Sequence, residues 1–180
     1  MDLFFGLIIV AIVCILFITY VSIYNVYQSY IIRINEAESN IDSTLRKRFD
    51  LLSKSIGIIK ASCDIDGEIL ENIVKLRSRK LSNFELDRQL YDSINEFNTY
   101  KEKYKELSNV ESFVKIDQAL TDSETEIFAL RKYYNDIITK YNKMIRMFPS
   151  NIVARLCKYQ TKTYFDGKNM EDEIINDFKL

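Results

Sequence analysis

The sequence predicts an all-α protein in which an N-terminal transmembrane helix continues into a long antiparallel bundle of three to four helices. Three observations indicate this fold. Residues 3–32 contain no Asp, Glu, Lys or Arg. The 180 residues include only four Gly and one Pro, which leaves little material for β-turns. After the apolar stretch, apolar residues recur at spacings of three, four and seven, which is the periodicity of packed helices.

The stretch Leu3–Ile23 is predicted to cross a membrane as one helix. A hydrocarbon core of about 30 Å requires roughly 20 apolar residues at 1.5 Å each. The alternative of a buried core helix is less favoured, because such helices seldom run this far without a charge. Asp2 follows Met1 and no A-x-A pattern is present, so we expect the span to stay attached rather than to be cleaved as a signal peptide. Four tyrosines at the exit of the span are expected at the membrane interface: Tyr20, Tyr24, Tyr27 and Tyr30.

We expect three regions: an N-terminal transmembrane anchor over residues 1–27, a helical bundle domain over 28–166, and a C-terminal tail over 167–180. The tail is either frayed or a weak docking helix, with disorder favoured. All 25 Lys and Arg follow the span and 26 residues are acidic, so the soluble part is close to neutral. This balance does not indicate a nucleic-acid partner.

The membrane helix is predicted to continue into the soluble domain, because no helix breaker precedes Gly57. Its apolar residues are spaced by three or four and form one stripe. The stripe consists of Ile34, Ala37, Ile41, Leu45, Phe49, Leu52, Ile56 and Ile59. The turn formers of Asp64–Glu68 are expected to end this helix. The D-x-D-G fragment there lacks the twelve-residue ligand series of a calcium loop, so a helix connection is preferred.

The next helical segment carries apolar residues from Ile69 to Leu76 and again from Leu90 to Tyr104. Between them, Ser82 and Glu85 have the S-x-x-E spacing of a capping box, so we expect a break or kink near residues 78–84.

The last long helix is predicted to begin at a second S-x-x-E motif, Ser108 to Glu111, and to end at Pro149. It carries two rows of core positions repeated every seven residues, which is typical of bundles and coiled coils. The first row is Phe113, Leu120, Ile127, Tyr134, Tyr141 and Phe148. The second row is Ile116, Ser123, Leu130, Ile137 and Met144, in which only Ser123 is polar.

These motifs resemble the LemA family of bacterial single-span membrane proteins. The resemblance covers roughly residues 24–165 and is most specific in two runs. One run contains Ile41-Asp42, Leu45-Arg46-Lys47-Arg48 and Asp50-Leu51, and the other contains Tyr134-Asn135, Tyr141-Asn142 and Phe148-Pro149. The resemblance implies one N-terminal span and a long antiparallel helical bundle, and it implies no catalytic residues.

The sequence favours a non-enzymatic function. The chain has no His, and its three cysteines show neither a disulfide framework nor a C-x-x-C spacing. No nucleophile beside a base, no metal cluster and no glycine-rich phosphate loop can be assembled, so we expect no cofactor, no metal and no catalytic site. The prediction is a membrane-anchored interaction module or scaffold with a protein partner. The alternative is a component of a membrane sensing or signalling pathway.

A basic belt is the candidate partner-binding surface. If turns lie near residues 62–66 and 106–109, antiparallel packing places residue 80 opposite about residue 47 and about residue 134. The candidate contacts are Arg46, Lys47, Arg48, Arg77, Arg79 and Lys80, and the belt also includes Lys75, Arg131 and Lys132. The belt would bind an acidic partner. Alternatively, it is neutralised by ordinary surface pairs with Asp42, Asp50, Glu85 and Asp136.

The orientation expected from the positive-inside rule places the large domain in the cytoplasm. Arg33 and the Arg46–Arg48 run follow the span, whereas only the terminal amine precedes it.

Overall fold

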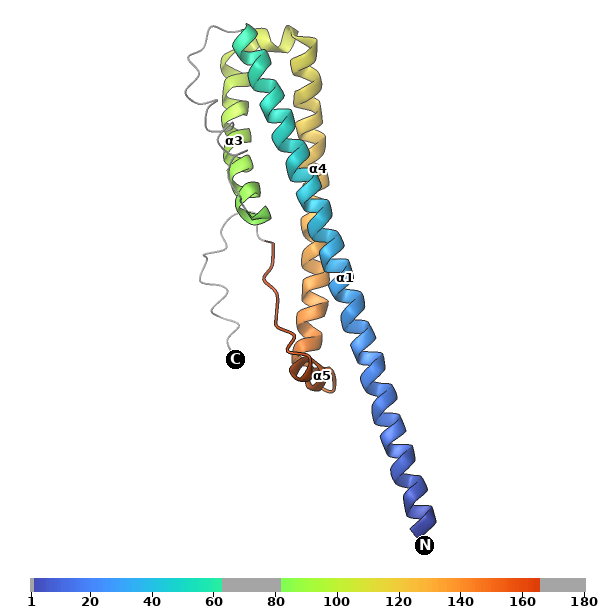
Figure 1. Ribbon diagram of the computed structural model, residues 1–180. Coiled ribbons are helices and arrows are strands. Elements are labelled where there is room, and N and C mark those ends of the chain that lie inside the picture. Colours follow the sequence, from blue (N-terminus) through green and yellow to red (C-terminus); the bar gives the residue numbers. More distant parts are fainter. Residues whose placement is uncertain (1, 63–81, 166–180) are drawn as a thin grey trace. The chain divides into compact units, whose positions relative to one another are not determined.

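The computed structural model describes residues 2–62 and 82–165, and all the elements in these ranges are helical (Figure 1). Helix α1 spans Asp2–Ser62 and α3 spans Asn83–Lys103. The short 3₁₀-helix η1 covers Lys105–Asn109 and leads to α4, Glu111–Arg146. Helix α5 covers Ser150–Leu156. The predicted all-α fold is therefore confirmed, whereas the turn at 64–68, the helical residues 69–76 and the tail at 167–180 lie outside the described residues.

The N-terminal part of α1 is apolar enough to cross a membrane, and no residue of its most apolar 18-residue stretch is buried. Its side chains from Leu3 to Ile18 are exposed. A helix of this length and composition can cross a hydrocarbon core, where every backbone polar group is satisfied within the helix. This agrees with the predicted single span.

The chain forms two compact units. Among the described residues, unit 1 combines those up to Glu36 with Tyr134–Tyr164, and unit 2 combines 37–62 and 82–133 with Phe165. Helices α1 and α4 each contribute to both units. The boundaries 1–27, 28–166 and 167–180 remain a prediction.

In unit 1, the first part of α1 packs against the end of α4 and α5. The ring of Tyr27 is fully buried and meets Tyr141 edge to face, with ring centroids 6.0 Å apart. Tyr27 therefore belongs to the core, and its predicted place in the aromatic lining of the membrane interface is wrong. The side-chain amide of Asn142 donates to the carbonyl of Lys162 (2.8 Å) and accepts from its amide (2.9 Å). These two bonds fix the chain after α5 along α4.

In unit 2, α1, α3 and α4 lie side by side, with α4 antiparallel to both others (Figure 1). The apolar stripe of α1 is buried at every predicted position within this unit. The predicted capping by Ser82 is confirmed, since its hydroxyl oxygen accepts from the amide of Glu85 (3.3 Å). The stacked rings of Phe97 and Phe113, 5.2 Å apart, close the α3–α4 end of the core.

Two predicted details of α4 are wrong. Ser108 lies inside η1, and its hydroxyl donates to the carbonyl of Lys105 (2.5 Å) instead of capping α4. Phe148 is 77% exposed, because α4 has already ended at Arg146 and the seven-residue repeat no longer places it on the core face. The other five positions of that row are buried.

Candidate functional site

The described residues of the basic belt on α1 each face a carboxylate. Arg46 donates from Nε to Oδ2 of Asp42 (2.7 Å), one turn earlier on α1. Lys47 contacts Oε2 of Glu126 on α4, with 3.2 Å between the charged atoms. Both basic side chains are more than half exposed. Because exposed ion pairs are worth only about 0–1 kcal/mol, these two pairs can exchange with solvent or with another acidic group.

Arg48 differs from its neighbours because its side chain is only 2% exposed. Its guanidinium group is paired with the carboxylate of Glu124 on α4, which is half exposed. Arg48 is therefore an internal residue that ties α1 to α4.

The structure describes only some of the belt residues that follow α1. Those outside the described residues are Lys75, Arg77, Arg79 and Lys80. Arg131 lies on α4 and pairs with the buried carboxylate of Asp87 on α3, whereas Lys132 is exposed. The pair with Asp42 is as predicted, but Glu124, Glu126 and Asp87 were not among the acidic partners that the sequence suggested.

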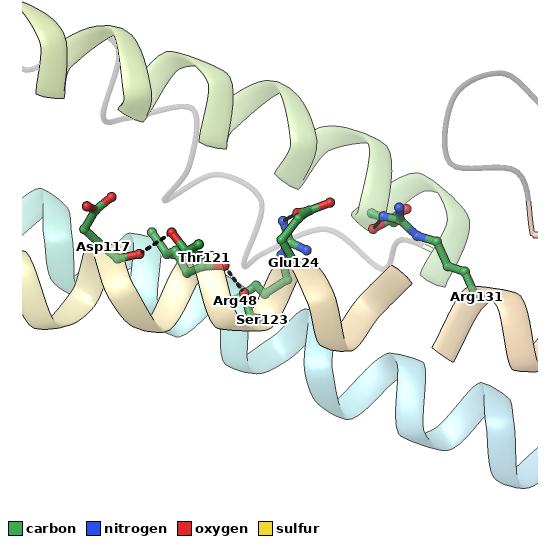
Figure 2. Close-up of polar contacts among 8 residues, drawn as sticks. Arg48, Asp117, Thr121, Ser123, Glu124 and Arg131 are labelled. Atoms are coloured by element: carbon green, nitrogen blue, oxygen red, sulfur yellow. Dashed lines mark hydrogen bonds and ion pairs between the residues drawn. The ribbon is translucent and has the colours of Figure 1, made fainter. Parts of the chain in front are cut away.

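Together these groups form an internal charge cluster, which we define as Arg48, Asp87, Glu124 and Arg131. It joins three helices of unit 2, since Arg48 lies on α1, Asp87 on α3, and Glu124 and Arg131 on α4. Figure 2 shows Arg48 and Glu124 directed toward one another, with Arg131 further along α4. The sequence signal for this cluster is positional, because Asp87 lies three residues before Leu90 and Arg48 three after Leu45, on the apolar stripes of their helices.

Burial dominates the electrostatics of the cluster. Removal from water raises the pKa of Asp87, and the hydrogen bond and charge of Arg131, followed by the charge of Arg48, oppose this shift. Arg131 also stacks above the ring of Phe165, 5.9 Å from its centroid. Among the described residues, Nε and Nη1 of Arg48 and Nε of Arg131 have no hydrogen-bond partner. Buried donors without partners lower stability, so the cluster favours one arrangement of the helices without maximising the stability of the fold.

The chemistry available to the cluster is ion pairing and hydrogen bonding. It contains no hydroxyl or thiol paired with a base. Within residues 2–62 and 82–165, no group of three or more His, Cys, Asp or Glu side chains is placed to hold a metal ion. The arrangement therefore sets which faces of α1, α3 and α4 meet.

We expect Glu124→Ala to destabilise the protein more than Arg48→Met. Removing the carboxylate leaves a buried guanidinium without its ion-pair partner, at a cost of about 1–3 kcal/mol given that water reaches the half-exposed position. Arg48→Met removes the buried charge itself and should change stability by about 1 kcal/mol or less. Urea unfolding of the full chain in lipid nanodiscs, followed by circular dichroism, measures both.

The matched control for this comparison is Glu111→Ala, which removes an exposed partner of Lys115 on the same helix. It should change the free energy of unfolding by less than about 0.5 kcal/mol. A larger loss for Arg48→Met than for Glu124→Ala would contradict the assignment of Arg48 as a buried charge that depends on Glu124.

Comparison with known proteins identifies relatives of the chain. The model of the LemA family matches residues 37–176. Protein LemA from Metamycoplasma hominis is 27% identical over 155 residues, an alignment that covers 82% of this chain and 70% of that protein. The family match includes most of unit 2 and the parts of α4 and α5 that belong to unit 1. Because this match extends over well more than half of its length, the chain belongs to the LemA family.

Proposed function

We propose that this protein is a non-enzymatic, single-span membrane protein whose helical part acts as an interaction module or scaffold at the bacterial envelope. The observation that carries this proposal is the side chain of Phe128. It is 67% exposed on the outward side of α4, next to Ile127, which is fully buried. Aromatic side chains on a rigid helix are the typical anchors of protein interfaces, because they bury much apolar area at a small cost in conformational entropy.

Charged groups would supplement this anchor. Arg46 and Lys47 keep exposed side chains, and their surface pairs are weak enough to be exchanged for an acidic partner. We propose these two, with Arg77, Arg79 and Lys80, as the basic contacts. Binding through them should weaken with salt, because exposed charges are screened over about 10 Å at 0.1 M. Arg48 takes an internal role in this proposal because its side chain is buried.

The proposed orientation places the helical part that follows the span in the cytoplasm. Arg33 and the Arg46–Arg48 run, which follow the span, support it. Basic residues near a span favour the cytoplasmic side. An engineered cysteine at Thr163, which is exposed, tests this. Rapid labelling of that thiol by an impermeant reagent in intact cells would contradict the proposal.

Photo-crosslinking in cells tests the interaction module. A photoreactive phenylalanine analogue in place of Phe128 should capture a defined protein, which is then recovered from detergent. The same analogue at Asn98, an exposed position of α3, is the control. The proposal expects crosslinked bands that are specific to position 128. When the analogue is moved to a neighbouring exposed position of α4, the same bands should form, and they should disappear when Phe128→Asp is added. Identical bands from both positions would contradict it.

A signalling component is the second candidate, and the continuity of α1 favours it. One uninterrupted helix runs from Asp2 to Ser62, so a movement of the span can be transmitted as a rigid displacement. The crosslinking experiment separates the two candidates. A partner that stays the same under envelope stress favours the scaffold, whereas exchange of partners under stress favours signalling.

A further inference from the structure

Exposed apolar side chains gather in unit 1 where α4 ends and α5 begins. Helix α5 buries Ser150, Val153 and Ala154 and directs other side chains outward. Four outward side chains of this turn and helix are apolar and at least half exposed: Met147, Phe148, Ile152 and Leu156. Arg155 of α5 is exposed beside them. A helix that faces water on one side normally carries mainly polar residues there. The outer face of α5 instead combines large apolar side chains with a basic one.

Four contacts fix this region beside α1. The hydroxyl of Tyr20 lies 3.7 Å from the sulfur of Cys157. The hydroxyl of Tyr27 donates to the carbonyl of Ser150 (3.2 Å). The side-chain amide of Gln28 donates to the hydroxyl of Tyr159 (2.8 Å), and the ring of Tyr159 packs on Tyr27 with centroids 5.0 Å apart.

These contacts also fix the depth of α5 relative to the membrane. Tyr20 lies within the apolar stretch of residues 3–23, and Gln28 lies about 12 Å further along the helix at 1.5 Å per residue. In unit 1, α5 lies next to α1 and the N-terminal part of α1 runs on beyond it (Figure 1). A span that places residues 3–23 in the hydrocarbon core brings α5 to the level of the lipid headgroups.

The charge of this region is strongly positive, although the whole chain has a net charge of −1. Between residues 134 and 164 the only acidic residue is Asp136. The basic residues there are Lys140, Lys143, Arg146, Arg155, Lys158 and Lys162. Lys143, Arg146, Arg155 and Lys158, which flank the apolar side chains, are all exposed. Basic and apolar side chains on one surface are the combination that binds the interface of an anionic bilayer.

We propose that this surface is a second membrane contact, separate from the span, that binds anionic lipids. We call it the interfacial surface and define it as Met147, Phe148, Ile152 and Leu156 with Lys143, Arg146, Arg155 and Lys158. The apolar side chains enter the region between headgroups and acyl chains. The basic side chains extend along the interface to the lipid phosphates. The contact would hold the end of α4 against the membrane and thereby set the direction in which the bundle leaves it.

A single-tryptophan experiment tests this inference, because the chain has no Trp of its own. Phe148→Trp reports on the interfacial surface, and Ile32→Trp is the control. Ile32 is an exposed apolar residue of the same unit, about 18 Å further along α1 than Tyr20. Each full-length variant is reconstituted into vesicles containing about one third phosphatidylglycerol, with the phosphatidylcholine brominated near the headgroup end of its acyl chains. Only protein that floats with the vesicles is measured, so insertion of the span, on which the inference rests, is established separately.

The expected result is emission from Phe148→Trp at shorter wavelength than from Ile32→Trp, with bromine quenching stronger by at least about twofold. Quenching no stronger than in the control would overturn the proposal. Short-wavelength emission without quenching would also overturn it, because a protein surface, such as a second copy, would then cover Phe148.

The lipid charge is tested by the same signal. Quenching of Phe148→Trp should fall in vesicles of phosphatidylcholine alone. Adding Arg146→Gln and Arg155→Gln should reduce quenching in the anionic vesicles and remove most of the difference between the two compositions. Equal quenching of the parent variant in both compositions would show that anionic headgroups are not recognised.

Discussion

Replacing Ile127 by Asp is expected to unfold the helical part of the protein, whereas the same change at the next residue, Phe128, should be tolerated. Ile127 is fully buried on the core side of α4, and Phe128 is mostly exposed. Asp at position 127 would lose the apolar contacts of Ile and bury a carboxylate without a partner. These effects together cost at least about 5 kcal/mol, comparable with the total stability of about 5–15 kcal/mol of an ordinary domain.

The measurement is the helical signal of the full chain in nanodiscs during urea titration, supported by amide hydrogen exchange. The Ile127→Asp variant should retain exchange protection mainly in the membrane span. The free energy of unfolding of the Phe128→Asp variant should lie within about 0.5 kcal/mol of that of the parent protein. Because both variants introduce the same charge on the same helix, equal midpoints would refute the assigned face of α4.

The long helices and their core faces could be predicted because each depends on a local pattern. All eight predicted stripe positions of α1 are buried, since a spacing of three and four places side chains on one face whatever the neighbour is. The first row of α4 holds as far as Tyr141 and fails at Phe148, where the helix has ended. In the second row, Ser123 is fully buried, with its hydroxyl donating to the carbonyl of Leu120 (2.6 Å). A polar residue that bonds its own helix can occupy a core position.

The direction and axial alignment of the helices could not be predicted from local patterns. The sequence suggested one long segment over residues 66–106 that runs antiparallel to the first helix. The first part of this segment lies outside the described residues, and its second part, α3, runs parallel to α1 and antiparallel to α4 (Figure 1). The ion pairs Asp87–Arg131 and Lys101–Asp117 align α3 with α4. In the structure, residue 87 therefore lies opposite residue 131. The predicted alignment, residue 80 opposite 134, would instead place residue 83 opposite 131, a difference of about one helical turn. Such a shift changes which charges meet while leaving every apolar stripe intact.

The same distinction explains the outcome for the candidate site. Basic residues on α1 could be listed from the sequence, but whether each faces water or the core depends on the neighbouring helix. Arg46 and Lys47 are exposed, and Arg48 lies on the edge of the stripe and is buried. The interfacial surface could not be predicted from the sequence either, because it forms only when Tyr20, Tyr27 and Gln28 hold α5 beside α1.

Replacing Asp87 by Leu is expected to cost about 3–5 kcal/mol, although Leu is better suited to a buried position. The carboxylate of Asp87 is 3% exposed and is the partner of Arg131, which is itself mostly buried. Removing it leaves the guanidinium group in the core without a counter-charge, and desolvation of that charge is no longer compensated. The substitution Asp87→Asn should cost less, because the amide oxygen still accepts a hydrogen bond from Arg131.

The double variant Asp87→Leu with Arg131→Met separates a charge effect from a packing effect. If the cost of the single change comes from the unpaired Arg131, removing both charges should restore most of the lost stability, as replacement of a buried ion pair by apolar residues is often neutral or stabilising. Arg88→Ala, on the exposed side of α3, is the control and should change the free energy of unfolding by less than about 0.5 kcal/mol. A double variant as unstable as Asp87→Leu alone would mean that the shape of Asp87, rather than its charge, holds α3 against α4.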